Sequence, residues 1–323
     1  MNEAPTLTEI AAAREKLGDY VLTTPVLEWK SNFKDELLGK SSRPVFKLEL
    51  FQYGGSFKPR GALMNMFDLS KEEFQRGVTA VSAGNHAIAV GYAAQIMGTT
   101  AKVVMPKSAN PFRVQRCREQ GTEVILVDHV GQAFDMVEKI RQEEGRVFVH
   151  PFEGKLTTIG TATVGYEYCQ QVSDLDAAII PIGGGGLAAG MATAIKAMNP
   201  NCKVYGVEPF GADSMSRSFA SGKPESIESV KTMADSLGAP FAMPYTFDLC
   251  RQFLEKIVRV DDEALKKSMR IMFTELKLVA EPAAAASLAA FMGPLREELD
   301  GKKVGLIACG SNIDLDTFYQ NIQ

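Results

Sequence analysis

The sequence contains few of the residues that bind transition metals or form disulfides. It has three histidines in 323 residues, and none is spaced from another as a zinc-binding pair. Its five cysteines are scattered and include no C-x-x-C pair, which suits a reduced cytosolic protein. We therefore expect a cytoplasmic protein with neither a catalytic zinc nor a disulfide framework.

A strong excess of charge and a membrane-spanning segment are also lacking. The formal net charge is −4 and the pI is about 5.6, which argues against nucleic acid or an anionic membrane as the main partner. Residues 1–14 do not have the basic-then-apolar order of a signal peptide. Residues 177–195 are almost wholly apolar, but Pro181 and a run of glycines divide them into a strand, a turn and a helix. We expect a small-molecule ligand, with no membrane or nucleic-acid partner.

Apolar runs of strand length alternate with helical patterns along most of the chain. This alternation predicts an α/β fold with two open, mainly parallel sheets and helices on both faces. The length suffices for two ordinary domains. We expect a small domain at 71–150, inserted between the parts 1–70 and 151–323 of a larger domain. The predicted strands are 45–50, 78–82, 101–105, 123–127, 146–149, 177–182, 203–207, 256–260 and 303–308. The predicted helices include 85–97, 111–119 and 159–171.

The stretch from Gly54 to Ala62 places a lysine where a helix is expected to begin. Ser56 is predicted to be the N-cap, and Pro59 is tolerated in the first turn. Lys58 would then lie at the positive end of the helix dipole, where its protonated form is disfavoured. This indicates a nucleophilic amine, with an ordinary solvated lysine as the alternative.

Four consecutive glycines, Gly183 to Gly186, connect an apolar strand to an apolar helix. Glycine loses much conformational entropy on folding, so a bare connection would not favour four of them. Backbone N–H groups at a helix start can wrap around a phosphate. We therefore predict a phosphate site here, with a purely structural turn as the alternative.

Three other strand ends have polar or small residues that could meet a ligand. The turn from Ser82 to His86 could bind a carboxylate, or be an ordinary turn capped by Asn85. Cys309 could face a ring nitrogen, or be a small buried apolar residue. Glu208, with Ala212 and Ser214, could surround a cation, although a helix-capping acid is the favoured interpretation.

An activated lysine, a phosphate site, an asparagine turn and a partner for a ring nitrogen are together the parts of a pyridoxal 5′-phosphate site. The motif Ser56-Phe57-Lys58-Pro59-Arg60-Gly61-Ala62, the turn Ser82-Ala83-Gly84-Asn85-His86-Ala87 and the four glycines resemble the fold-type II pyridoxal-phosphate enzymes, whose fold is that of the tryptophan synthase β subunit. The likeness is greatest to the serine/threonine dehydratases (ammonia-lyases), and it extends over nearly the whole chain.

The resemblance implies a role for each of these positions. Lys58 would form the Schiff base, and Phe57 would pack near the pyridine ring. Asn85 would bond the ring hydroxyl oxygen, and Cys309 would face the pyridine nitrogen. Two sets remain. Backbone N–H groups that would hold the phosphate belong to Gly183, Gly184, Gly185, Gly186 and Leu187. Residues that would seat the substrate carboxylate are Ser82, Ala83, Gly84, Asn85 and His86.

The resemblance also implies an activity: β-elimination of water from L-threonine or L-serine to give 2-oxobutanoate or pyruvate and ammonia. The alternatives are another β-hydroxy amino acid (3-hydroxyaspartate, phenylserine or a hydroxyectoine breakdown product), serine racemisation, or a non-catalytic pyridoxal-phosphate-binding protein. Ala83 stands where eukaryotic-type racemases have serine, which disfavours racemisation. Thr161 stands where many threonine dehydratases have glutamine, which leaves the substrate open.

Two further expectations come from the family. Glu208, Ala212 and Ser214 resemble its cation site, and Ser214 stands where relatives that take a divalent ion have an acid. A monovalent ion, K⁺, is therefore expected if any cation binds. The family also implies a homodimer or a homotetramer.

Overall fold

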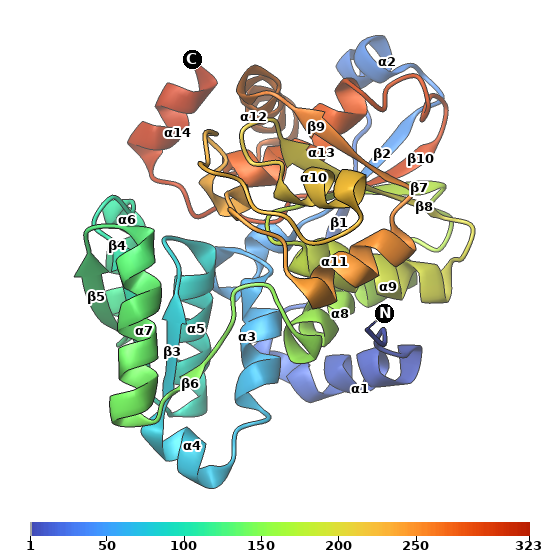
Figure 1. The fold of residues 1–323 in the computed structure, drawn as a ribbon. Helices are drawn as coiled ribbons and strands as arrows, with labels where there is room; N and C mark the ends of the chain where they lie inside the picture. The colour runs from blue at the N-terminus through green and yellow to red at the C-terminus, as the bar shows by residue number, and fades with distance from the viewer. Residues whose placement is uncertain (1) are drawn as a thin grey trace.

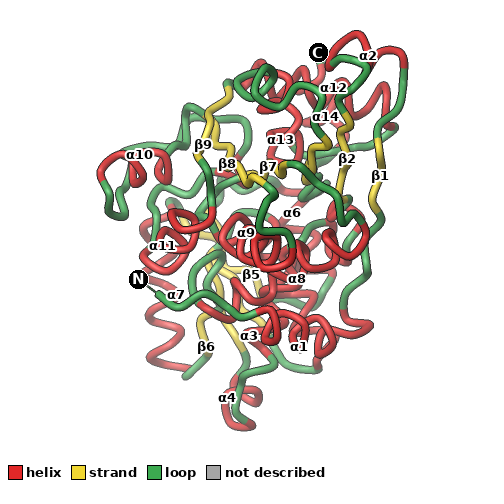
Figure 2. Tube along the Cα trace, turned by 90° about the vertical axis from the view of Figure 1, so that its right-hand side faces the viewer, coloured by secondary structure: helices red, strands yellow, loops and turns green. Residues whose placement is uncertain are grey.

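The computed structural model describes residues 2–323, which form two sheets with helices packed around them. The larger sheet has six strands in the order β1-β2-β10-β7-β8-β9. Its strands are β1 (Val26–Glu28), β2 (Arg43–Lys47), β7 (Ala177–Pro181), β8 (Lys203–Pro209), β9 (Lys256–Val260) and β10 (Lys303–Ile307). Only the pairing of β1 with β2 is antiparallel among the paired strands of this sheet within residues 2–323. Figure 2 shows these strands side by side from β9 to β1.

The smaller sheet has four parallel strands in the order β5-β4-β3-β6. Its strands are β3 (Val78–Val81), β4 (Ala101–Pro106), β5 (Glu123–Val127) and β6 (Val147–Phe148). This sheet and its helices lie at the lower left of Figure 1, away from the six-stranded sheet. The predicted α/β class with two mainly parallel sheets is confirmed. The domain boundaries at 71 and 150 remain a prediction.

Helices cover both sheets. They are α1 (Leu7–Leu17), α2 (Asn32–Leu38), α3 (Lys58–Met66), α4 (Lys71–Arg76), α5 (Asn85–Met97), α6 (Pro111–Glu119), α7 (Val130–Glu144), α8 (Lys155–Gln171), α9 (Gly186–Met198), α10 (Ser214–Ser221), α11 (Pro244–Phe253), α12 (Asp262–Leu276), α13 (Pro282–Met292) and α14 (Leu315–Ile322). Within residues 2–323, none of these helices has the combination of length and apolar character that crossing a bilayer requires.

Helix α8 lies between α3 and α9, and small residues allow all three to approach closely. A Cβ on Gly160 of α8 would lie 2.4 Å from the carbonyl oxygen of Arg60 in α3. On the other side, a Cβ on Gly190 of α9 would lie 2.2 Å from Oγ1 of Thr161. Real Cβ atoms do not approach so closely, so a larger residue at either glycine would push a helix away. Since α3 begins at Lys58 and α9 at Gly186, this packing relates the lysine to the glycine turn.

Candidate active site

Lys58 is the first residue of α3, and its side chain enters a cavity between the two sheets. Its Nζ donates a hydrogen bond to the carbonyl oxygen of Pro151 at 2.5 Å and lies 5.2 Å from the ring centroid of Phe57. The predicted N-cap is wrong: the cap is Phe57, which makes no side-chain capping bond. Ser56 is one residue too early, in extended backbone, and its buried hydroxyl has no hydrogen-bond partner within residues 2–323.

The environment of Lys58 makes its amine easier to deprotonate. Burial disfavours the ammonium and lowers the pKa of Lys58 to about 8, although Cys309 and Glu281 act in the opposite direction. A lysine with this pKa has a substantial neutral fraction slightly above neutral pH. Lys58 is therefore not an ordinary solvated lysine, and its amine is suited to nucleophilic attack.

The residues predicted to hold the cofactor line one cavity. They come from β-strand ends and helix starts far apart in the sequence. Six residues that were not predicted also line the cavity: Phe152, Pro181, Ser236, Leu237, Glu281 and Ala283. The predicted ones are Phe57, Lys58, Asn85, Gly183, Gly184, Gly185, Gly186, Leu187 and Cys309. The turns at Gly183 and Cys309 follow β7 and β10 of the larger sheet, and Asn85 follows β3 of the smaller one, so the carboxyl ends of strands from both sheets contribute to the cavity.

The glycine turn is shaped so that no side chain fits. A Cβ on Gly184 would lie 2.2 Å from the ring of Phe152, and one on Gly186 would lie 2.6 Å from the carbonyl oxygen of Phe152. Gly185 has a φ of +92°, a conformation that favours glycine. The turn leads directly into α9, whose first N–H groups have no partner inside the helix. Such a turn can take an anionic group, as a phosphate requires.

Asn85 lines the same cavity and takes part in a network of side-chain amides and carboxyls. Its Nδ2 donates to Oε1 of Glu281 at 2.6 Å, and its Oδ1 accepts from Nδ2 of Asn312 at 2.8 Å. These contacts orient the amide of Asn85. Glu281 is fully buried, and burial raises its pKa to about 7.

Burial also raises the pKa of Cys309, so its thiol is neutral, as a partner for an unprotonated ring nitrogen requires.

The turn from Ser82 to His86 lines a second cavity, which Lys58 also enters. The predicted cofactor and substrate residues therefore meet at one amine.

His86 donates from Nε2 to the carbonyl oxygen of Val149 at 2.8 Å. Burial, with help from the nearby Lys58, lowers the pKa of His86 to about 3 and that of His150 to about 4. Both imidazoles are thus neutral at physiological pH, and the Lys58 amine is the group suited to accept a proton.

Three phenylalanine rings that were not predicted line this second cavity. Phe134 comes from α7, Phe152 follows the smaller sheet, and Phe241 precedes α11. The ring centroids of Phe134 and Phe241 are 6.4 Å apart, and those of Phe152 and Phe241 are 6.0 Å apart. No local motif marks these positions, because they become neighbours only when the two sheets come together.

Arg113 of α6 and Asp235 are unpredicted charged residues that line this cavity, and the charge of Arg113 is already balanced. Its guanidinium donates to Oδ1 and Oδ2 of Asp235, and Nη2 lies 3.4 Å from Oε2 of Glu281. The side chain is 5% exposed. A buried guanidinium facing two carboxyl groups is not a free binding site for a further acid.

The residues of the predicted cation site lie together outside both cavities. Glu208 at the end of β8 accepts hydrogen bonds from the backbone N–H groups of Met215 and Ser216 and from the hydroxyl of Ser216, at 2.9, 2.8 and 2.6 Å. Burial raises the pKa of Glu208 to about 7. Glu208 thus binds the start of α10, as the helix-capping interpretation requires. Ser214 donates its hydroxyl to the carbonyl oxygen of Ala239, and K⁺ at Glu208, Ala212 and Ser214 stays a prediction.

A protein-family profile described as pyridoxal-phosphate-dependent enzyme matches residues 19–310. The chain belongs to this family. Its cofactor is pyridoxal 5′-phosphate, and the lysine, the glycine turn and the neutral thiol described above fit that group in charge and shape. The resemblance seen in the sequence is thereby confirmed.

Known members of the family resemble the chain over nearly its full length. It is 49% identical to the phenylserine dehydratase of Ralstonia pickettii over 318 residues, which is 98% of this chain and 96% of that protein. It is 36% identical to the L-threonine ammonia-lyase of Thermotoga maritima over 312 residues, which is 96% of this chain and 76% of that protein. The structure of maize serine racemase superposes with a TM-score of 0.93 at 35% identity, covering 99% and 97% of the two chains. The chain therefore belongs with pyridoxal-phosphate enzymes that dehydrate, deaminate or racemise amino acids.

Proposed function

We propose that this enzyme dehydrates a β-hydroxy amino acid with an aromatic side chain, of the phenylserine class, and releases the 2-oxo acid and ammonia. Phenylserine was an alternative in the sequence analysis, where L-threonine and L-serine were expected first. The alternative now has the better support, because the relative with 49% identity is a phenylserine dehydratase and because the substrate cavity has an aromatic wall.

The observation that carries the proposal is the cluster of Phe134, Phe152 and Phe241 on the cavity wall. Their neighbouring ring centroids lie 6.0 and 6.4 Å apart, which is within the range of favourable aromatic contacts. Phe134 is 37% exposed, so a phenyl group beside it would bury apolar surface. The methyl group of threonine would leave most of this surface in contact with water.

The charges of the cavity argue against 3-hydroxyaspartate. A second substrate carboxylate would need a cation, and the arginine of this cavity, Arg113, already faces Asp235 and Glu281. Asp235 would also repel a second carboxylate, because like charges at this range oppose binding. An uncharged aromatic side chain avoids both costs.

Residues of the chain supply binding and proton transfer. The substrate carboxylate would bind the N–H groups of the Ser82–His86 turn at the start of α5. Pyridoxal phosphate, held by Lys58, Asn85, Cys309 and the glycine turn, would supply an electron sink for the Cα–H bond. Lys58 would release the cofactor to the substrate and accept the α-proton at Nζ. The Cβ–O bond would then break as the electrons of the Cα–H bond form the Cα=Cβ bond, and Lys58 Nζ would return its proton to the leaving oxygen, so that the β-hydroxyl leaves as water. The released enamine would take up one water and hydrolyse to phenylpyruvate and ammonia.

Racemisation needs a second base on the opposite face of the substrate, and the position expected to supply it is Ala83. A methyl group cannot accept a proton. His86 also lines the cavity, but its pKa of about 3 makes it a weak base at physiological pH. Elimination is therefore favoured over racemisation.

The experiment is a panel of substrates assayed for 2-oxo acid release and for chirality of the remaining amino acid. Phenylserine should give the highest kcat/KM, about tenfold or more above L-threonine, because burying a phenyl ring is worth more than 1.4 kcal/mol. The kcat/KM for L-serine and for 3-hydroxyaspartate should be lower still than that for L-threonine. No D-serine should form from L-serine.

Phe241→Ala provides the matched comparison. It should lower kcat/KM for phenylserine about tenfold while changing that for L-threonine less, since the lost contact is with the ring. A panel in which L-threonine is preferred would overturn the aromatic assignment but leave the dehydratase class intact. A coloured holoenzyme without turnover on any member would instead point to a non-catalytic binding protein.

A further inference from the structure

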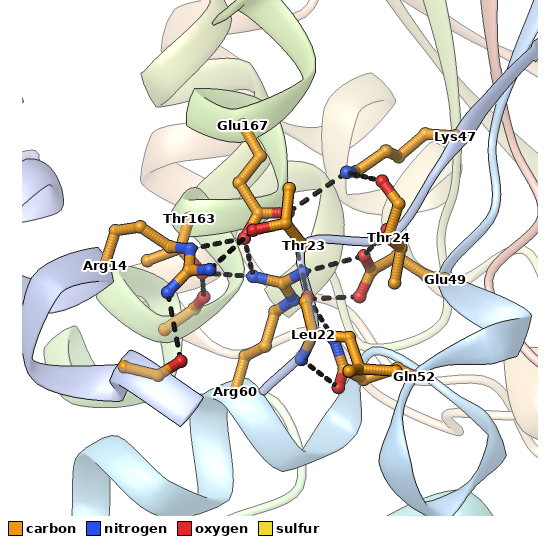
Figure 3. Close-up of polar contacts among 12 residues, drawn as sticks. Arg14, Leu22, Thr23, Thr24, Lys47, Glu49, Gln52, Arg60, Thr163 and Glu167 are labelled. Atoms are coloured by element: carbon orange, nitrogen blue, oxygen red, sulfur yellow. Dashed lines mark hydrogen bonds and ion pairs between the residues drawn. The ribbon is translucent and has the colours of Figure 1, made fainter. Parts of the chain in front are cut away.

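A buried network of charges lies behind Lys58, on the side of α3 that faces away from the cofactor cavity. Figure 3 shows its centre, the guanidinium of Arg60, between the carboxylates of Glu49 and Glu167. Arg60 is two residues after Lys58 in the first turn of α3. The side chains of Arg60 and Glu49 are 0% exposed and that of Glu167 is 2% exposed.

Every nitrogen of the Arg60 guanidinium has a partner. Nε and Nη2 donate to the two oxygens of Glu49, each at 2.9 Å. Nη1 and Nη2 donate to the two oxygens of Glu167 at 2.8 and 2.9 Å, and Nη1 also donates to Oγ1 of Thr163 at 3.1 Å. Two bidentate pairs restrict the guanidinium in direction as well as in distance.

The surrounding charges keep the carboxylate of Glu167 ionised. Arg14 and Lys47 also pair with Glu167, and Lys47 donates to it at 3.0 Å. Burial would raise the pKa of Glu167, but Arg60 and Lys47 together lower it below its ordinary value. A buried network of this kind does little for stability compared with an apolar core of the same volume. Its position two residues from Lys58 therefore points to another role.

The network joins α3 to α8, and α8 in turn contacts the glycine turn. Glu167 and Thr163 are both on α8. On its opposite side, Thr161 donates from Oγ1 to the carbonyl oxygen of Gly186 at 2.7 Å. Pyridoxal phosphate would be attached to Lys58 at its aldehyde carbon and to the glycine turn at its phosphate. Because its pyridine ring is rigid, the distance between Lys58 and the glycine turn must match its length. Helix α8 contacts both α3, which carries Lys58, and Gly186 of the glycine turn.

We propose that Arg60 and Glu167 are positioning residues for Lys58: they hold the first turn of α3 on α8, so that the amine lies at the distance from the glycine turn that pyridoxal phosphate spans. The role is distinct from catalysis, because neither side chain lines the cofactor cavity. It applies to any substrate of this enzyme.

The test separates attachment of the cofactor from binding of its phosphate end. Apoenzyme is mixed with pyridoxal phosphate, and the rate of covalent capture is followed by visible absorbance. The affinity for pyridoxine 5′-phosphate, which has the ring and the phosphate but no aldehyde, is measured by calorimetry. Glu167→Gln should slow capture about 10- to 100-fold, as expected for an amine displaced by about 1 Å. Its affinity for pyridoxine phosphate should be unchanged.

Two reference variants define the outcomes. Tyr168→Phe removes a buried hydrogen bond of the same helix, from Tyr168 to the carbonyl oxygen of Val45, and should leave both measurements unchanged. Lys58→Ala should abolish capture and keep the analogue affinity, which tests the role of Lys58 separately. The proposal is overturned if Glu167→Gln captures the cofactor at the wild-type rate, or if it loses capture and analogue binding to the same extent.

A milder variant covers the case in which Glu167→Gln does not fold. Thr163→Val removes one acceptor of Arg60 and keeps a similar side-chain shape. It should slow capture in the same direction by a smaller factor, again without weakening pyridoxine phosphate. A wild-type capture rate in this folded variant would then overturn the proposal.

Discussion

Lys58 gains its reactivity from burial, which removes water that would otherwise stabilise its charge. Its pKa of about 8 lies well below the ordinary lysine value of 10.5. Because only the neutral amine attacks the cofactor aldehyde, capture of pyridoxal phosphate by the apoenzyme should accelerate as the pH rises through about 8. Stopped-flow absorbance at a series of pH values measures this rate.

Lys58→Ala is the control for that experiment, and it should show neither capture nor release of 2-oxo acid. A capture rate that does not change with pH across this range would contradict the lowered pKa. Full turnover by Lys58→Ala would remove Lys58 from the mechanism altogether.

Individual side chains of the site differed in how well the sequence revealed them. Lys58 and the four glycines were conspicuous because their local composition is hard to explain otherwise. Glu281 and Arg113 were missed, since an acid before a proline and an arginine in a helix are both common on surfaces. Their burial results from contacts across long sequence separations, which a local pattern does not contain.

At the scale of single elements, the glycine turn at the start of α9 depends on close packing of its backbone against Phe152, which leaves no room for a side chain. An added Cβ at Gly184 would lie 2.2 Å from the Phe152 ring, so Gly184→Ala must displace either the ring or the turn. Overpacking of this kind costs about 1–3 kcal/mol, which corresponds to cofactor binding weakened by about tenfold to hundredfold. Equilibrium titration of the apoenzyme with pyridoxine phosphate measures the change.

Gly131→Ala in α7 is the matched control. Its Cβ would lie 3.2 Å from the exposed side chain of His129 only, and cofactor affinity should not change. An unaltered affinity in Gly184→Ala would show that the phosphate does not bind at this turn.

Helices with a clear start and a long apolar pattern were predicted accurately. The expected helices at 85–97 and 111–119 coincide with α5 and α6. Helix α8 begins four residues before the expected start at 159, because its N-cap, Gly154, provides no side-chain cap that a sequence would show. Helices α2, α4, α11 and α14 were missed. For α2 and α4 the reason is that a helix of one or two turns has too few residues for a periodic pattern.

At the scale of the whole molecule, the buried carboxyl group of Glu281 makes stability depend on pH. Its pKa is about 7 in the folded protein and 4.5 in the ordinary state, so the folded protein keeps a proton that the unfolded chain releases. The contribution of Glu281 is therefore most favourable below pH 4.5 and declines as the pH rises to about 7. The decline is about 3 kcal/mol, at about 1.4 kcal/mol for each pH unit.

Glu281→Gln should remove this dependence. Between pH 5 and pH 8 the free energy of unfolding should fall less in the variant than in the wild type, as measured by urea denaturation. The groups that face Glu281 include Arg113, Asp235, Asn85, Ser236, Lys58 and Cys309, and all remain in the variant. Equal pH dependence in the two proteins would show that Glu281 is ionised in the folded state.

The sequence by itself determined the α/β class and the cofactor family, and it predicted residues that line one cavity in the fold. Repeated strand and helix patterns specify buried parallel sheets, and a lysine motif with four glycines has few other physical explanations. Only the tertiary structure decided the character of the substrate cavity and the support behind Lys58. Phe134, Phe152 and Phe241 come from separate segments, and Arg60 meets Glu167 across more than a hundred residues. Such contacts arise because two sheets and the helix α8 pack together, and no local pattern in a single sequence encodes that packing.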